Sequence, residues 1–232
     1  MPAEARSLTK RFIPIGEEVR LGEGVFLYLG GVGPKRSRLA AEALLRGGAD
    51  ALLSWGSAGG LAANLFPGAL ILPKFVIAAD QTRCPVHPQW HRYLWNRLEG
   101  RLDLHAEPLA ESRVVLSHPA DKIALFSQTG AIAVDMESST VGAVAQEAGL
   151  PFIAIRAIAD PAHKTIPQSI LTAVDDFGRL ELFRLVKELI NRPIELFTLA
   201  RLVGDFRSAH RSLEAAARLI DKNFFPLNGI EP

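Results

Sequence analysis

Short apolar segments with strand propensity alternate along this chain with longer segments of helical composition. Because parallel strands need a helical crossover between them, this alternation predicts an α/β fold: a three-layer α/β/α domain around a mostly parallel central sheet. The strand-like segments are residues 25–29, 49–55, 69–78, 131–134 and 151–158, with 114–116 expected to be extended, and the helical segments are 34–46, 89–98, 119–127 and 138–148.

The pattern changes from residue 167 onwards. Apolar residues recur at helical spacing over 182–190 and again over 196–206, Pro193 lies between the two segments, and arginines are frequent in both. No linker is long or polar enough to divide the 232 residues. We therefore expect residues 1–232 to form a single domain, with 193–220 as a C-terminal extension of amphipathic helices.

Charge and cysteine content limit the partners and the environment. Lys and Arg number 26 against 25 Asp and Glu, so the chain lacks the basic excess of most nucleic-acid-binding proteins. Its one cysteine, Cys84, forms no intrachain disulfide, and residues 1–15 lack the apolar core of a signal peptide. No run of about 18 apolar residues occurs. We expect a cytoplasmic protein without a nucleic-acid partner.

Glycines and acids follow several of the predicted strands. Because the loops at the carboxyl ends of parallel strands meet at one edge of a sheet, residues 30–33, 56–60, 135–137 and Asp160 are expected to converge. Glycine turns allow backbone N–H groups to approach a phosphate or a sugar hydroxyl, because no Cβ atom is in the way. Each of these turns is equally consistent with a tight connection that binds nothing. Glu137 is suited to two neighbouring ribose hydroxyls or to a helix N-terminus. Asp160, before Pro161, also fits an ordinary turn.

Other kinds of site are disfavoured. A dinucleotide site needs a third glycine where Arg36 stands. His87 and His91 are four residues apart but lack a third metal ligand, so they are interpreted as surface histidines. Cys84 has no evident partner base, and no Gly-x-Ser-x-Gly motif occurs. We expect neither a metal nor a covalent nucleophile.

Four motifs occur in an order that resembles the purine nucleoside phosphorylase and methylthioadenosine/S-adenosylhomocysteine nucleosidase superfamily. They are GVG at 31–33, SWGSAGGL at 54–61, AVDMES at 133–138 and PFIAIRAIAD at 151–160. The resemblance covers roughly residues 1–190. It implies the nucleoside phosphorylase-like fold and cleavage of the N-glycosidic bond of an adenosine-type nucleoside, with release of adenine. The C-terminal arginine-rich helices are similar to those of the hopanoid-associated branch, whose proposed substrate is adenosylhopane.

The resemblance implies a role for each motif. Asp160 matches the acid that protonates the purine at N7, which requires a pKa raised by burial or by a neighbouring anion. Glu137 matches the residue that binds the ribose 2′- and 3′-hydroxyls, with Met136 against the sugar and Val32 near its other face. The loop beside the base and the nucleophile is matched by Ser57, Ala58 and Gly59. The loop for phosphate or water is matched by Gly31, Gly33 and Gly56. Glu4 matches the carboxylate that activates water in hydrolytic members.

Three positions depart from the family pattern. The family's opening strand should precede the Glu4 motif, but only three residues come before Glu4 in this sequence. Ser54 stands where hexameric phosphorylases carry a phosphate-binding arginine, which favours hydrolysis unless Lys35, Arg36 or a neighbouring subunit supplies the charge. Ala159 replaces the serine that usually precedes the catalytic aspartate, which removes one hydrogen-bond donor.

Substrate and partners remain open at this level. We expect a purine nucleoside or an adenosyl lipid as substrate, a homo-oligomer, and no cofactor, with phosphate as an optional co-substrate. The alternatives are a methylthioadenosine/S-adenosylhomocysteine or futalosine-type nucleosidase, and a catalytically silent protein that binds a nucleoside or lipid. The C-terminal helices either cover the sheet or an oligomer interface, or make a peripheral contact with an anionic membrane.

Overall fold

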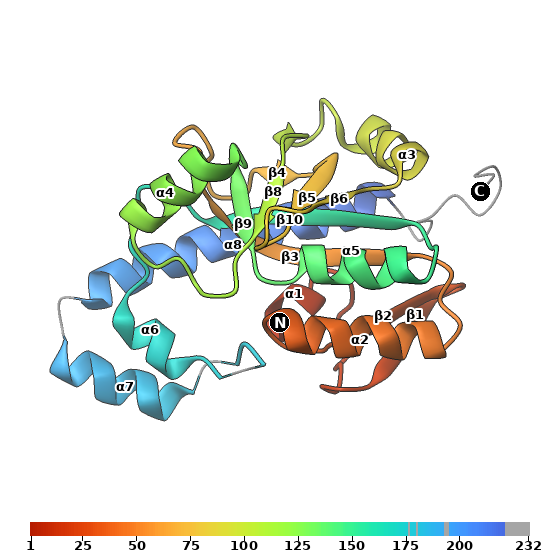
Figure 1. Cartoon of the computed structure of the whole chain (residues 1–232). Helices are drawn as coiled ribbons and strands as arrows, with labels where there is room; N and C mark the ends of the chain where they lie inside the picture. Colours follow the sequence, from red (N-terminus) through yellow and green to blue (C-terminus); the bar gives the residue numbers. More distant parts are fainter. Residues whose placement is uncertain (176, 180, 193–194, 221–232) are drawn as a thin grey trace.

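A large mixed sheet forms the centre of the computed structural model, which describes residues 1–175, 177–179, 181–192 and 195–220 (Figure 1). Its eight strands follow the order β6-β5-β8-β9-β3-β10-β4-β7. Within the described residues, the parallel pairs are β3 with β10, β4 with β7, β5 with β8, and β8 with β9. The antiparallel pairs are β4 with β10, β3 with β9, and β5 with β6. The strands are β3 (Leu52–Gly60), β4 (Leu70–Ile71), β5 (Phe75–Ile77), β6 (Arg83–Pro85), β7 (Leu104–His105), β8 (Leu109–Glu111), β9 (Ala133–Asp135) and β10 (Phe152–Asp160).

Helices cover both faces of this sheet, which confirms the predicted α/β architecture. In Figure 1, α5 passes in front of β3 and β10, whereas α8 passes behind them. The long helix α8 buries Ala209, Leu213, Ala216 and Ile220, which lie four, three and four residues apart and so form one stripe. The helices are α1 (Pro2–Ala5), α2 (Pro34–Arg46), α3 (Pro88–Leu98), α4 (Pro119–Thr129), α5 (Ser138–Glu147), α6 (Gln168–Ala173), α7 (Leu182–Asn191) and α8 (Glu195–Ile220).

The glycine-rich segment 56–60 is part of a strand, so the prediction that the chain turns at Gly56 is wrong. β3 continues to Gly60 because β10 and β9 pair with it on either side. The glycines serve another purpose here: a Cβ atom on Gly56 would lie 2.5 Å from Arg156 Nη1 and 2.9 Å from Glu4 Oε1. The missing side chain therefore leaves room for charged groups above the strand.

Three other strand predictions need correction. Residues 69–78 form two strands, β4 and β5, that lie far apart in the sheet order, and Pro73 falls in the break between them. Residues 25–29 contribute to a separate hairpin of β1 (Glu18–Gly22) and β2 (Val25–Tyr28). Residues 114–116 form no strand, because the pairing next to β9 is made by β8.

The helices expected over 34–46, 89–98, 119–127 and 138–148 are confirmed within a few residues at each end. The junction predicted at Pro193 lies outside the described residues. α6 and α7 pack against each other at the lower left of Figure 1. No helix in the described part of the chain has the length and apolar character needed to cross a membrane.

Two helical glycines provide a matched test of packing in this fold. A Cβ on Gly142 in α5 would lie 2.8 Å from the Phe152 ring, whereas one on Gly204 in α8 would meet nothing within 4 Å. We expect Gly142→Ala to lower the free energy of unfolding by about 1–3 kcal/mol through overpacking. Gly204→Ala should raise it by up to about 1 kcal/mol through helix propensity. Urea titrations measure both, and a stabilised Gly142→Ala variant would contradict the packing described.

Candidate active site

A buried arginine lies at the centre of a polar cluster over the middle of β3 and β10. Arg156 occupies the middle of β10, opposite Gly56 of β3, and is 3% exposed. Its Nε lies 2.7 Å from Asp135 Oδ2, and its Nη2 lies 3.6 Å from Glu137 Oε2. Burial alone would lower the pKa of the guanidinium, but Asp135, Glu137 and Glu4 outweigh it and raise the pKa. The charge is therefore retained inside the protein.

Hydroxyl groups fix the orientation of this guanidinium. Nη2 donates to Ser54 Oγ at 2.7 Å, and Nε and Nη2 both donate to Ser138 Oγ. The Ser138 hydroxyl in turn donates to Asp135 Oδ2, and the Ser138 N–H donates to Asp135 Oδ1 at 3.2 Å. Ser54, which stands where hexameric phosphorylases have an arginine, thus serves here as an acceptor for Arg156.

Glu137 precedes α5 and faces the glycine turn before α2. Its Oε1 accepts a hydrogen bond from the Gly33 N–H at 2.9 Å, and Gly33 has a φ of +91°, which favours glycine. Burial, Asp135 and Glu4 raise the pKa of Glu137 to about 7, against the opposing effects of Arg156 and the Gly33 N–H. Near neutral pH this carboxyl group therefore exchanges between its two protonation states.

Glu4 lies in the same cluster although it is far away in sequence. It is part of the short helix α1, and its Oε1 accepts from the Ser57 N–H at 2.7 Å and the Ser57 hydroxyl at 2.6 Å. Its Oε2 accepts from the Met1 amino group at 2.5 Å. Burial raises the pKa of Glu4, but the Met1 ammonium, Arg156 and the Ser57 hydrogen bond together lower it below its usual value. Glu4 is thus an ionised acceptor.

Asp160 ends β10, four residues beyond Arg156, and has different partners. Its Oδ2 accepts from Lys122 Nζ at 2.5 Å, and the carboxyl group lies over Gly59 of the neighbouring strand. Burial raises the pKa of Asp160, Lys122 opposes this effect, and Asp205 adds to it, so that the net shift is upward. Its Oδ1 is buried without a hydrogen-bond partner among the described residues. A buried carboxyl oxygen without a partner is suited to a ligand group, from which it accepts a hydrogen bond when ionised and to which it donates one when protonated.

The other residues expected at the site divide into two groups. Gly33 and Ser57 contact the acids, and Gly56 and Gly59 leave the space above β3. Val32 and Met136 are half-buried beside Gly33 and Glu137, and Gly31 has a φ of +110°. Ala58 is not brought to the acids, because its side chain belongs to the apolar core.

Asp135, Glu137 and Glu4 meet at Arg156, over the middle of β3 and β10, whereas Asp160 lies at the end of β10. β9, which leads to Asp135 and Glu137, is antiparallel to β3, so its end lies beside the interior of that strand. The sequence motif RAIAD contains Arg156, but its role was not predicted. A charged residue within a run of buried strand residues is a usable signal, since such a charge needs partners. Lys122 gave no comparable signal.

The two histidines weighed as metal ligands have structural partners. His87 caps α3, where its Nδ1 accepts from the Trp90 N–H at 3.3 Å, and His91 Nε2 lies 2.9 Å from the Leu72 carbonyl oxygen. Within the residues that the structure describes, no three His, Cys, Asp or Glu side chains are grouped as metal ligands would be.

A family model for the phosphorylase superfamily matches residues 15–191. The chain belongs to this superfamily. Membership confirms the predicted family at that level and supports the prediction of an enzyme that acts as a nucleoside phosphorylase or nucleosidase.

Solved structures give the same assignment for the fold of this phosphorylase-superfamily chain. A 5′-methylthioadenosine/S-adenosylhomocysteine nucleosidase from Helicobacter pylori is 18% identical, with a TM-score of 0.65 over 95% of this chain and 92% of that one. The Neisseria meningitidis enzyme, solved with methylthio-immucillin-A, is 16% identical, with a TM-score of 0.61 over 84% and 78%. The Streptococcus pyogenes S-adenosylhomocysteine nucleosidase is 22% identical, with a TM-score of 0.56 over 60% and 66%.

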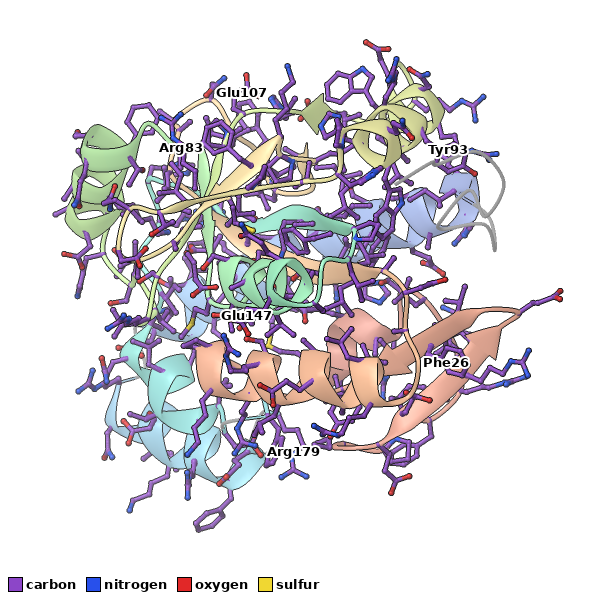
Figure 2. The ribbon with its side chains drawn as sticks, turned by 45° about the vertical axis from the view of Figure 1, so that its right-hand side comes forward. Phe26, Arg83, Tyr93, Glu107, Glu147 and Arg179 are labelled. Carbon is purple, nitrogen blue, oxygen red and sulfur yellow. The ribbon has the colours of Figure 1, made fainter. Side chains whose placement is uncertain are left out.

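Removing the central charge should destabilise the protein strongly. Arg156→Met leaves buried carboxylates uncompensated, and we expect a loss of about 3–5 kcal/mol in the free energy of unfolding. The matched control is Arg38→Met, which removes an exposed pair between α2 and α5 at Glu147, labelled in Figure 2. Because solvent screens that pair, we expect little change. Equal effects of the two substitutions in denaturant titrations would contradict the role given to Arg156.

Proposed function

We propose that this chain cleaves the N-glycosidic bond of an adenosine-type nucleoside and releases adenine, with water as the nucleophile. One observation carries the proposal: the pKa of Glu4, which contacts Ser57 of β3, is lowered, whereas that of Asp160, at the end of β10, is raised. The third acid, Glu137, faces the glycine turn at Gly33. Separated acid and base carboxyls are the arrangement that glycosidic cleavage requires.

Each carboxyl group then has one task. Asp160, protonated, donates its proton to purine N7 as the bond between the sugar C1′ and N9 breaks, so the base leaves as neutral adenine. Glu137, ionised, accepts hydrogen bonds from the ribose hydroxyls and stabilises the positive charge that develops on the sugar. Glu4 accepts a proton from the water that attacks C1′. None of these steps needs a metal or an organic cofactor.

The charge balance around Arg156 favours water over phosphate. Four carboxyl groups, Asp135, Glu137, Glu4 and Glu111, act on this one guanidinium. Ser54, which accepts from Arg156, stands where the resemblance places the arginine of hexameric phosphorylases. A phosphate dianion would be repelled by these acids. Hydrolysis therefore has the better support, and phosphorolysis becomes an outcome of the adenine-release assay.

Two further proposals concern the domain organisation and the oligomeric state of the chain. We propose that residues 1–232 act as one nucleoside phosphorylase-like domain, since α8 packs along β10 and reaches α1 and α3. We also propose a homo-oligomer, because α4 exposes Ile123 and Phe126 three residues apart on one face, at 60% and 39%. A second copy of the chain is the occupant that the family resemblance suggests for such a face.

An adenosyl lipid is the second candidate substrate, favoured by the surface of α7 and the start of α8. Large apolar side chains are exposed there next to basic ones, a combination that suits an anionic lipid surface. We therefore propose a peripheral membrane contact that gives access to a substrate such as adenosylhopane. The exposed apolar residues are Phe183, Ile190, Leu196, Phe197 and Val203, and the exposed basic residues are Arg184, Lys187, Arg192 and Arg201.

Adenine release from purified protein tests the proposed reaction. Incubation with adenosine, methylthioadenosine, S-adenosylhomocysteine, futalosine or an adenosyl lipid should liberate free base from at least one of them, without added phosphate. Asp160→Asn should lower kcat about 10²- to 10⁴-fold, and Glu137→Gln should lower kcat/KM roughly 10- to 100-fold through loss of a charged hydrogen bond. Because Glu137 has a pKa of about 7, kcat/KM should fall as the pH drops below that value.

The control for these variants is Asp103→Asn, a substitution at an exposed position paired with His105. It should leave adenine release unchanged. Tight binding of adenine nucleosides with no release from any substrate would support the silent binding protein, and release that requires phosphate would assign a phosphorylase.

Vesicle binding tests the lipid candidate separately. The protein should cosediment with vesicles that contain anionic lipid and much less with neutral ones, and Phe197→Asp should weaken this binding. Phe66→Asp is the control, because Phe66 is equally exposed, at 67% against 66%, in the loop after β3. Equal recovery of the protein with both kinds of vesicle would remove the support for a membrane contact.

A further inference from the structure

Lys122 is a fully buried lysine whose three donors are all satisfied. It lies in the first half of α4 and is 0% exposed. Its ammonium group lies 2.5 Å from Asp160 Oδ2, 3.0 Å from the Pro161 carbonyl oxygen and 3.1 Å from the Lys164 carbonyl oxygen. An ammonium group has three N–H donors, so none is left for solvent or ligand. A charge buried in this way is costly unless it is paired and hydrogen-bonded.

Lys122 occupies the inward face of α4, three residues before the partly buried Leu125, whereas the outward face of this helix is partly apolar. The neighbouring Ile123 is 60% exposed and Phe126 is 39% exposed, while the lysine between Asp121 and Ile123 points inward. In a helix that only covers a sheet, the apolar side chains would be buried and the lysine exposed. An inward position of such a helix is normally apolar, so the burial of Lys122 depends on the three acceptors that its ammonium group meets.

This cation holds Asp160 by one oxygen only. The contacts of Lys122 with Asp160 and with the two carbonyl groups after β10 fix both the side chain and the backbone that follows it. The second oxygen, Asp160 Oδ1, is left buried and without a partner among the described residues, although the residue is 8% exposed. The lysine therefore determines which oxygen is available to a ligand.

We propose that Lys122 is a positioning residue for Asp160: it holds Oδ2, presents Oδ1 to the leaving base, and stabilises the carboxylate that remains after proton transfer. This inference rests on the proposed function and deepens it. In the step itself the proton on Oδ1 passes to purine N7 while the bond between C1′ and N9 breaks and its electron pair goes to the base. Asp160 becomes anionic against the ammonium group, which keeps its own three protons throughout.

Other charged groups near Asp160 are less directly placed. Lys164, in the loop after β10, pairs with Asp205 of α8 at 2.5 Å, and His163 of the same loop is exposed. Asp205 raises the pKa of Asp160, and Lys164 lowers it more weakly than Lys122 does. Lys122 is thus the cation in direct contact with this acid among the described residues, and Lys164 is its natural control.

The titration of Asp160 measures this role directly. In protein labelled with carboxyl-¹³C aspartate, the Asp160 signal is identified by its loss in Asp160→Asn. Because an adjacent cation lowers a carboxyl pKa by about 1–3 units, Lys122→Met should raise the pKa of Asp160 by that amount. Lys122→Arg, which keeps the charge, should leave it close to the wild-type value, and Lys164→Met should change it much less than Lys122→Met does.

The kinetic readout separates positioning from mere support of the fold. Lys122→Met should lower kcat by about ten- to a hundredfold with a smaller change in KM, since the lost charged contact acts on the proton-transfer step. The limb of the pH profile where activity falls as Asp160 ionises should move to higher pH by the same shift as the NMR titration. If Lys122→Met does not fold, Lys122→Gln, which is neutral but keeps an N–H donor, gives the same comparison.

Two results would overturn the proposal. One is an unchanged Asp160 titration in the neutral variant, and the other is full kcat without Lys122. Because the NMR titration needs no turnover, it remains decisive for Lys122 if the wild-type protein releases no base, a result that would count against the proposed function alone.

Discussion

The positive charge of Arg156 is the constraint on which the buried part of this site depends. Asp135, Glu137 and Glu4 come from β9, the start of α5 and α1, and they would repel one another in a medium of low polarizability without this guanidinium. Gly56 has no side chain to occupy the space that Arg156 and Glu4 fill. The fold and the site are therefore linked, because the glycine at position 56 of β3 leaves the space for the Arg156 guanidinium that β3 and β10 bury.

The charges are balanced differently at the middle of β10 and at its end. At the middle of β10, burial together with Asp135 and Glu4 raises the pKa of Glu137 to about 7 in spite of Arg156, whereas Glu4 is held ionised by Met1, Arg156 and Ser57. At the end of β10 a single lysine faces a single buried aspartate, and burial outweighs the lysine in setting its pKa. Under the proposed function, these unequal environments let carboxyl groups of similar intrinsic acidity serve as base, sugar ligand and acid.

Much of the fold, but less of the site, could be predicted from the sequence. Helices such as α2 and α5 are encoded by local signals, namely proline or glycine at their ends and apolar residues at helical spacing. The course of β3 through Gly60 could not be predicted, because it depends on pairing with β9 and β10, which is not a local property. The acids Glu4, Glu137 and Asp160 were found by motif. Lys122 was not, since its burial is determined by the partner it meets across 38 residues of sequence.

A crystal structure of the protein with a non-cleavable adenosine analogue tests the central claim most directly. The account predicts that the ribose hydroxyls bind the Glu137 carboxylate and that purine N7 lies within hydrogen-bond distance of Asp160 Oδ1, while Lys122 still holds Oδ2. An analogue bound away from these two carboxyl groups, or with its purine turned away from Asp160, would contradict it.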